Sequence, residues 1–321
     1  MKQLIKAIPV FAGILAGLQI TSCNDGRSTP AISKDRKDTI GCSPGNSKLD
    51  IQSIDRVTGM KGVEKNGEYK ITVPQNDLHI VVDGFKIIPP MGLGTWIAFT
   101  PCGDSVMMMG DIILTETDLA PVQREVIRQG LAITAIHNHF VRNRPNVMYM
   151  HIDGFGSVAK LAGNARAILD KVTEARGADP KAGKPDSVIN TINIALLDSV
   201  IGHKGEMSKG VYKYTIARPD VMLKEHGVSI STFMGFNTWA AWQGTADKAA
   251  VAGDFTMLMN EVEPVIKALV ENGIEVVAVH NHMVHEEPKI FFLHYWGVGP
   301  AAQLAKGLKA ALDQTGKDME H

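Results

Sequence analysis

The sequence predicts an α+β fold in which two similar halves follow each other in tandem, each a mostly antiparallel sheet with helices. Aligned against itself without a gap, at an offset of 143 residues, the chain matches 55–170 to 198–313 at 38 of 116 positions. Such self-similarity at one fixed spacing indicates a tandem duplication. Within each half, strand-like segments stand before and after an amphipathic helical segment, which is typical of α+β proteins.

The strands are predicted from alternating or continuous apolar runs. In the first half these runs are 69–73, 79–87, 96–101, 106–114, 131–140 and 147–153. The second half repeats the last two runs at 274–283 and 290–296. Successive side chains of a strand point to opposite faces, so the three consecutive Met residues in "VMMMGD" predict a strand buried on both faces.

Each half is also predicted to contain a helix between the strands. In the first half Asp118 can cap the helix and Gly130 can end it, with an apolar face made of Val122, Val126 and Ile127. In the second half Asn260 and Gly273 have the same roles, and the apolar face is made of Val262, Ile266, Leu269 and Val270. A second amphipathic segment, at 158–172, predicts the helix that closes the first half.

The N-terminal segment predicts export and lipid attachment. Two lysines precede an apolar run at 7–20, which is too short to span a bilayer but typical of a signal peptide. The run ends in "ITSC", so residues 1–22 are predicted to be removed and Cys23 to be lipidated; the alternative is a plain secretory signal. Residues 23–48 have the composition of a linker, and the repeats are placed at 49–176 and 190–315. Cys42 and Cys102 could pair in an oxidising compartment or stay free.

Composition excludes little. The chain is 45% hydrophobic and 21% charged, with a net charge of −1. No block of basic residues stands out, so we expect no nucleic-acid partner.

Each half contains His-Asn-His followed twelve residues later by a third histidine. Alternation puts the two nearby histidines of a strand on one face. If the following hairpin is symmetric about Pro145, His139 stands opposite His151, about 5 Å away between Cβ atoms. Three imidazoles on one patch predict a metal site with an open position. The candidate ligands are His137, His139 and His151 in the first half and His280, His282 and His294 in the second.

The metal and the neighbouring groups follow from the same register. Imidazole ligands without a thiolate suit zinc, although copper, nickel or iron would also accept them. Asp153 would face His137 as a ligand, a hydrogen-bond acceptor or a base, and Glu286 is the candidate base of the second half. Asp111 and Asp254 could orient ligating imidazoles or cap strand ends.

Arg142 and Arg144 could bind a substrate carboxylate or be solvated. Trp96 and Trp239 are expected to pack in the sheet cores. The alternative for the histidines is hydrogen bonding in the sheets without any metal.

Together the "ITSC" segment, the tandem halves and the repeated His-Asn-His pattern resemble the LppY/LpqO family of bacterial lipoproteins, which has no established function. The spacing His-x-His-x11-His is also similar to the zinc site of acetolactate decarboxylases and of related ester hydrolase candidates. The resemblance implies zinc on one or both histidine triplets. It also implies a lipid-anchored protein of the bacterial cell envelope, facing the periplasm or the cell exterior.

Two functions are therefore expected. The first is a zinc-dependent hydrolase or decarboxylase-like lyase that acts on a small ester or a keto or hydroxy acid. The second is a non-catalytic envelope lipoprotein that binds metal or a small ligand. In both, the membrane is reached only through the lipid anchor and the other partner is a small molecule.

Overall fold

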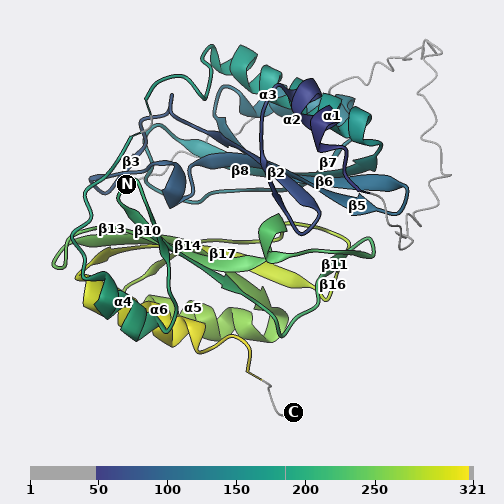
Figure 1. Ribbon diagram of the computed structural model, residues 1–321. Coiled ribbons are helices and arrows are strands. Elements are labelled where there is room, and N and C mark those ends of the chain that lie inside the picture. The colour runs from purple at the N-terminus through teal and green to yellow at the C-terminus, as the bar shows by residue number, and fades with distance from the viewer. Residues whose placement is uncertain (1–47, 185, 318–321) are drawn as a thin grey trace, which may run out of the picture. The chain divides into compact units, whose positions relative to one another are not determined.

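A computed structural model describes residues 48–184 and 186–317 of the chain. The predicted signal peptide and Cys23 lie outside the described residues, as do Cys42 and nearly all of the predicted linker. The described part confirms the α+β class and the tandem halves. Figure 1 shows four layers: helices of the first half, its sheet, the sheet of the second half, and the helices of the second half.

Both sheets have six strands in the same spatial order, and every neighbouring pair is antiparallel. In the first sheet the order is β1 (Val63–Lys65), β2 (Glu68–Pro74), β5 (Gly94–Cys102), β6 (Ser105–Thr115), β8 (Val147–Gly156) and β7 (Ala132–His137). In the second it is β9 (Glu206–Ser208), β10 (Val211–Ala217), β13 (Asn237–Gly244), β14 (Ala249–Leu258), β17 (Ile290–Gly299) and β15 (Glu275–His280).

Three α-helices cover the outer face of each sheet (Figure 1). The first half has α1 (Ile51–Thr58), α2 (Leu119–Arg128) and α3 (Val158–Arg176), and the second has α4 (Ile194–Ile201), α5 (Val262–Glu271) and α6 (Ala301–Leu312). Short 3-10 turns are η1 (Pro89–Met91), η2 (Thr232–Met234) and η3 (Met259–Glu261). No helix in the described ranges combines the length and the apolar character that crossing a bilayer requires.

Several predicted boundaries were wrong. The run 79–87 is not one strand but a tight hairpin of β3 (Val81–Val82) and β4 (Phe85–Lys86). The chain reverses there because Asp83 and Gly84 both have positive φ, 48° and 84°. Ile127 and Val270 lie 62% and 57% exposed instead of facing the sheets. Asn260 lies inside η3, one turn before α5 begins. Helices α1 and α4 were not predicted.

A second small sheet is confined to the second half. It consists of β11 (Lys224–Glu225), β12 (Val228–Ser229) and β16 (Glu286–Glu287). Strand β11 lies between the other two. Glu286 on β16 therefore stands opposite Glu225 on β11.

The pattern Asp-x-Val-x-Gly-x-Lys-Gly stands at residues 55–62 and again at 198–205, and it has a structural role in both halves. The Tyr212 hydroxyl donates to Asp198, at 2.8 Å, and accepts from the Gly205 backbone N–H, also at 2.8 Å. A Cβ on Gly205 would lie 2.7 Å from the carbonyl oxygen of Lys213, so only glycine fits. Asp55, Gly62 and Tyr69 repeat the arrangement in the first half. The pattern therefore fixes α1 and α4 onto the strands β2 and β10.

The apolar cores are arranged in two pairs. One core in each half packs the helices against the outer face of its own sheet. Two further clusters contain residues of both halves and join the inner faces of the two sheets. Along β6 the inner face runs from Met107 and Met109, through Asp111, to Ile113. The polar centre of the molecule thus lies between two apolar clusters that exclude water around it.

A buried arginine binds near the end of an interior strand of each sheet, β6 or β14, and the two arginines come from different places in the repeat. Arg176, at the end of α3, donates to the Ile113 carbonyl at 2.9 Å and to Asp118 at 2.8 Å. Arg218, which follows β10, donates to the Thr256 carbonyl at 2.7 Å and to Glu261 at 2.8 Å. Thr256 and Glu261 are the repeat equivalents of Ile113 and Asp118. The same site is therefore filled from two unrelated sequence positions.

Candidate metal centre

The six predicted histidines do not form two separate sites. They gather in one cluster between the sheets, where both triplets meet. His137 and His280 end the edge strands β7 and β15, and His151 and His294 lie within β8 and β17. His139 and His282 lie in the segments that follow the edge strands. The edges themselves are joined, because Thr134 Oγ1 donates to the His282 carbonyl at 2.6 Å and Asn281 Nδ2 donates to the Thr134 carbonyl at 2.8 Å.

The predicted hairpin register was wrong by four residues. His151 stands opposite Ala135 rather than His139, and His294 stands opposite Ala278 rather than His282. Each edge strand ends at its first histidine, so the chain between the strands is a long loop and not a symmetric hairpin. A shift in the ladder between Ile133 and Ala135 adds to the difference. His139 and His282 therefore reach the cluster from loops and approach the histidines of the other half.

The cluster is close to two-fold symmetric, as expected of a duplicated chain whose halves face each other. The rings of His137 and His280 stack with centroids 3.7 Å apart. The ring centroids of His139 and His294 lie 3.8 Å apart, and those of the equivalent pair, His151 and His282, lie 4.0 Å apart. The His139 ring also stacks on Tyr149, with centroids 3.4 Å apart, as the His282 ring does on Phe292, at 3.3 Å. Contacts between the halves are thus shorter than the contact between His137 and His139 of one half, 5.2 Å.

Ring nitrogens without a hydrogen-bond partner point to a ligand. His294 donates through Nδ1 to the Gly253 carbonyl at 3.1 Å, and its buried Nε2 has no partner in the described residues. His151 has the equivalent backbone partner in Gly110, and its Nε2 is also without one. Such backbone hydrogen bonds orient metal-binding imidazoles and leave the other nitrogen free to ligate. In total, five of the six rings carry a buried nitrogen without a partner in the described chain: His137, His139, His151, His280 and His294.

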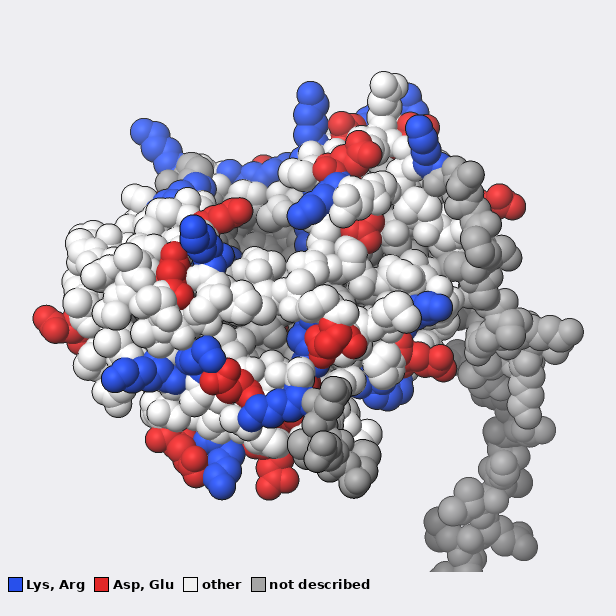
Figure 2. All heavy atoms as spheres, turned by 60° about the horizontal axis from the view of Figure 1, so that its bottom comes forward, with Lys and Arg blue, Asp and Glu red and all other residues white. Residues whose placement is uncertain are grey.

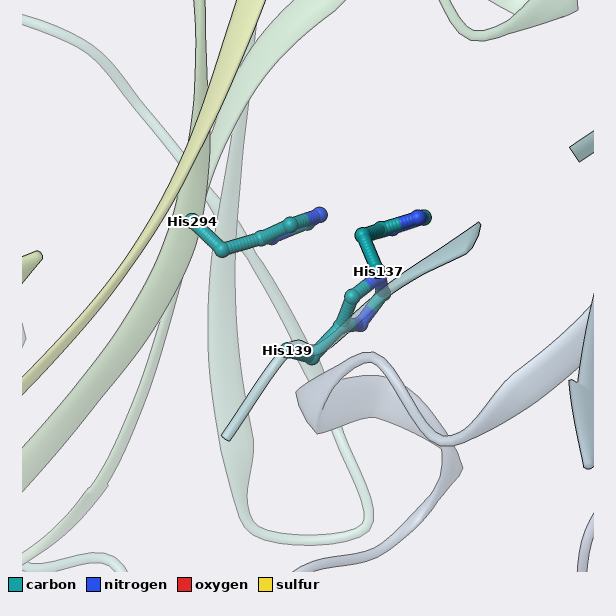
Figure 3. A group of neighbouring side chains, drawn as sticks. All are labelled: His137, His139 and His294. Carbon is teal, nitrogen blue, oxygen red and sulfur yellow. The ribbon is translucent and has the colours of Figure 1, made fainter. Parts of the chain in front are cut away.

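The donor atoms lie close enough to share an ion. Three overlapping groups have their donor atoms within 4.8 Å of one another: His137, His139 and His294; His137, His151 and His280; and Asp254, His280 and His282. Figure 3 shows the first group, in which the side chains of His137 and His139, from the first half, lie next to that of His294, from the second. Two of the three groups mix the halves, so the residues fit a metal that both halves hold in common. This fit rests on the chemistry of the donors, because imidazole nitrogen suits divalent transition metals.

Electrostatics keep these rings neutral, which is the state that binds a metal. Burial, followed by the neighbouring histidines, lowers the pKa of His137 and His282 well below the ordinary value. Burial also lowers the pKa of His280 to about 4. Neutral imidazoles at neutral pH need not lose a proton before they bind a metal ion.

Asp111 and Asp254 are buried beside the histidines. Their positions are in the middle of β6 and β14, so the alternative role as strand-end caps does not apply. Asp111 Oδ2 lies 3.8 Å from His139 Nε2, and Asp254 Oδ2 lies 3.6 Å from His282 Nε2. Burial raises the pKa of Asp111 to about 7 and that of Asp254 well above the ordinary value.

A cavity of about 380 Å³ opens onto the cluster. Equivalent residues of both halves line it in pairs: His139 and His282, His151 and His294, Asp111 and Asp254, Trp96 and Trp239, and Lys70 and Lys213. As predicted, the tryptophans pack against apolar cores, but these are the two clusters between the sheets, and both rings also form walls of the cavity. A Cβ on Gly92 would lie 2.9 Å from the Trp239 ring, and one on Gly235 would lie 3.4 Å from the Trp96 ring. Gly92 thus makes room for Trp239 of the other half, whereas a Cβ on Gly235 would only be in ordinary contact with Trp96.

The two predicted catalytic carboxylates lie elsewhere. Asp153 stands opposite Ala132, not His137, and among the described residues that line the cavity neither Asp153 nor Glu286 occurs. Both lie close to Glu225, which is fully buried. Burial raises the pKa of Asp153 to about 6, and burial together with the nearby Asp153 raises that of Glu225 to about 7. The structure therefore places Asp153 and Glu286 in a separate acidic cluster, outside the cavity.

The predicted substrate arginines are also outside the cavity lining. The Arg142 guanidinium donates to Asp83 at 2.8 and 2.9 Å and to Glu275 at 2.7 and 3.0 Å, so its donors are already engaged. Arg144 donates to the Asn143 carbonyl. On the face shown in Figure 2, cationic and anionic side chains are interspersed rather than gathered by sign.

Sequence reasoning missed the lysine pair of the cavity. Lys70 and Lys213 occupy equivalent positions in the repeat, each between a tyrosine and a threonine in the pattern Tyr-Lys-x-Thr. The pattern is identical in both halves, so the comparison of the halves contained the signal. No local pattern indicated that the lysines face the histidines, because the lysines lie on different strands from the histidines.

The fold and the centre define a class of protein: a duplicated α+β chain whose halves enclose one shared polyhistidine site. The model of the family described as Domain of Unknown Function (DUF1259) matches the chain twice, over residues 52–171 and 195–314, and the chain belongs to this family. The second match begins and ends 143 residues after the first, the offset at which the chain matches itself.

Other comparisons add little. No curated protein matches the chain. Among solved structures it is similar to EtuB from Clostridium kluyveri at 6% identity and a TM-score of 0.19, covering 80% of this chain and 90% of that one. It is similar to the trimeric bacterial microcompartment shell protein PduB at 12% identity and a TM-score of 0.19, covering 80% and 91%. Likenesses at this level carry no argument about fold or function.

Proposed function

We propose that the six histidines bind a divalent transition metal, zinc first among them, in one centre that the two halves share. The observation that carries the proposal is the set of buried ring nitrogens without a partner in the described chain. Burying a polar nitrogen without a hydrogen bond costs about 1–3 kcal/mol. Five such rings in one place would therefore destabilise the folded state considerably. A bound metal accounts for this cost, because it becomes the partner of these nitrogens.

The protein would then be a metalloenzyme that acts on a small ester or a keto or hydroxy acid. A bound ion would supply Lewis acidity toward a carbonyl or ester oxygen. The cavity, at about 380 Å³, has the size of a small-molecule site and opens onto four of the six histidines. Asp111 and Asp254 line it beside His139 and His282, so they are the carboxyls positioned to accept or donate a proton there. They replace Asp153 and Glu286 in that role.

A non-catalytic role is the second candidate, and one observation favours it. His137 and His280, which belong to two of the three donor groups, do not line the cavity. An ion held mainly by these two rings would be closed to substrate, as in structural metal sites. Such an ion would join the halves without taking part in a reaction.

We also infer that the protein is an envelope lipoprotein anchored through Cys23, as in the LppY/LpqO family. The support within the described residues is Cys102, which is disulfide-bonded. Disulfides persist in oxidising compartments outside the cytoplasm. Metabolic labelling with a fatty acid tests the anchor, since a Cys23→Ser variant should lose the label while the unaltered protein keeps it.

Metal content and hydrolysis of a generic ester, measured on residues 24–321 without a His tag, test the proposed activity. The expected result is zinc in the purified protein and zinc-dependent turnover. Asp111→Asn, which lies outside the three donor groups, should retain zinc but lose turnover about 10²–10⁴-fold, as for loss of a general acid or base. Asp254→Asn should lose turnover as well, and it should also weaken zinc binding if the group of Asp254, His280 and His282 holds the ion. Asp153→Asn is the control and should retain both. Zinc without any turnover on esters and keto acids would favour the non-catalytic role, and no zinc after supplementation would overturn both.

A further inference from the structure

Two lysines share the cavity with the histidines. Lys70 lies on β2 and Lys213 on β10, both partly buried and both lining the cavity. Lys70 Nζ lies 4.5 Å above the Trp96 ring, and Lys213 Nζ lies 4.2 Å above the Trp239 ring. Cation–π contacts of this kind hold an ammonium group in a fixed place. The lysine side chains are therefore positioned, not loose on a surface.

Neither ammonium group has a carboxylate partner within 4.0 Å in the described part of the chain. Glu68 acts on Lys70 and Asp254 acts on Lys213 only at longer range. The two lysines lie close enough to repel each other, and burial lowers the pKa of each to about 8. Two neighbouring cations in a partly dry cavity are unfavourable unless an anion joins them.

We propose that the cavity binds a small molecule through one compact anionic group, a carboxylate or a phosphate, held between Lys70 and Lys213. The molecule extends from the lysines along the tryptophan walls toward His139, His151, His282 and His294. The inference rests on the proposed function for what happens at the histidines, whereas the lysine clamp itself needs no metal. It narrows the substrate class of the proposed function to small organic anions, such as keto or hydroxy acids and esters that carry a carboxylate or a phosphate.

The two-fold arrangement explains why one anionic group suffices. Lys70 and Lys213 are equivalent in the repeat and approach the cavity from opposite halves. A carboxylate or a phosphate presents equivalent oxygens, so each ammonium can donate to one oxygen in a charge-assisted hydrogen bond. Arg142, one of the arginines predicted for this role, is engaged by Asp83 and Glu275. The cations of the described cavity lining are Lys70, Lys213 and the exposed Lys65.

Titration calorimetry on the mature chain, zinc-loaded and metal-free, tests the inference with three probes. Lactate represents a carboxylate, lactamide is its neutral counterpart, and inorganic phosphate represents the other anion. The variants are Lys70→Met, Lys213→Met and the double variant, and Lys306→Met, on the exposed face of α6, is the matched control. The metal content of every sample is measured in parallel.

We expect lactate or phosphate to bind the unaltered protein and the Lys306→Met variant, with lactamide failing to bind. Each single cavity variant should weaken anion binding by about tenfold or more, the size expected for one charge-assisted hydrogen bond. The double variant should abolish binding. Tighter binding of phosphate than of lactate would assign a phosphorylated ligand, and the reverse a carboxylic acid; both results support the clamp.

Two results would overturn it: equal anion affinity in the double variant, or no binding of either anion to the unaltered protein. These results are distinct from failure of the metal proposal, which would show as absent zinc with lysine-dependent anion binding intact. A double Lys→Arg variant guards against misfolding, because it keeps both charges and should bind anions where the double Met variant does not.

Thermal unfolding adds a second check. Removing an uncompensated cation should leave the Tm without anion unchanged or raised, while the increase of Tm on adding lactate disappears.

Discussion

The shared centre predicts that a histidine of either half controls metal binding by the whole protein. His137 is the most informative position, since its ring lies within 5.2 Å, centroid to centroid, of four other histidines of the cluster. Two of the three donor groups include it, and both groups also contain a histidine of the second half. His137→Ala should therefore impair binding that a separate site in the second half would retain.

The size of the effect can be worked out from binding linkage. Zinc at 100 times its Kd stabilises the folded state by about 2.7 kcal/mol if the unfolded chain does not bind it. For about 270 described residues, with an unfolding entropy of about 2.1 cal/mol/K per residue, each kcal/mol raises Tm by about 2 °C. Zinc should thus raise the Tm of the unaltered protein by about 5 °C. The His137→Ala and His280→Ala variants should each lose most of that increase.

Differential scanning fluorimetry with added zinc, next to metal content by mass spectrometry, measures both quantities. His203→Ala is the control, because this histidine is exposed and outside the cluster. A shared centre is excluded if His137→Ala keeps one zinc at the unaltered affinity together with about half of the Tm increase. That result would show two independent sites, one for each half, as the sequence alone had suggested.

Three further predictions concern stability. Gly253→Ala should cost about 3 kcal/mol in urea unfolding, because its Cβ would lie 2.1 Å from Tyr295 Oη and 2.2 Å from the Trp239 carbonyl oxygen. Gly163→Ala, with nothing within 4 Å, should be neutral or slightly stabilising, and equal costs at both glycines would refute the steric argument. Arg176→Met and Arg218→Met should each cost about 3–5 kcal/mol, since each leaves a buried carboxylate unpaired. Arg166→Met, at a half-exposed ion pair, should cost less than about 1 kcal/mol, and similar costs for all three variants would refute burial as the reason for the large cost at Arg176 and Arg218. Metal-free protein should lose stability as pH falls below about 6.5, because the unfolded chain binds protons that the buried histidines of the folded state, with their lowered pKa, do not. Asp111, Asp153 and Glu225 offset part of this loss, because their raised pKa lets the folded state bind protons in the same range. The loss should reach about 1.4 kcal/mol per pH unit for each such histidine, and a urea midpoint constant from pH 7 to 5 would speak against it.

The sequence by itself determined the duplication, the class of fold and the six histidines. These features are local or repeat at one fixed spacing: identity at an offset of 143 residues, alternation along strands, and turn residues at helix ends. Several short-range details were also readable but were read wrongly. The run 79–87 looks like one strand, yet the backbone turns at Asp83 and Gly84.

Only the tertiary structure decided how the histidines combine. Register across the loops after β7 and β15 depends on loop conformation, which apolar periodicity does not report. The inner faces of the two sheets meet because this contact buries the apolar residues on either side of the site. His139 contacts His294 as a consequence. The same packing brings Lys70 near Lys213 and places Trp96 and Trp239 at the cavity wall as well as against the cores between the sheets. Packing between distant segments minimises exposed apolar area over the whole chain, and no local pattern contains that sum.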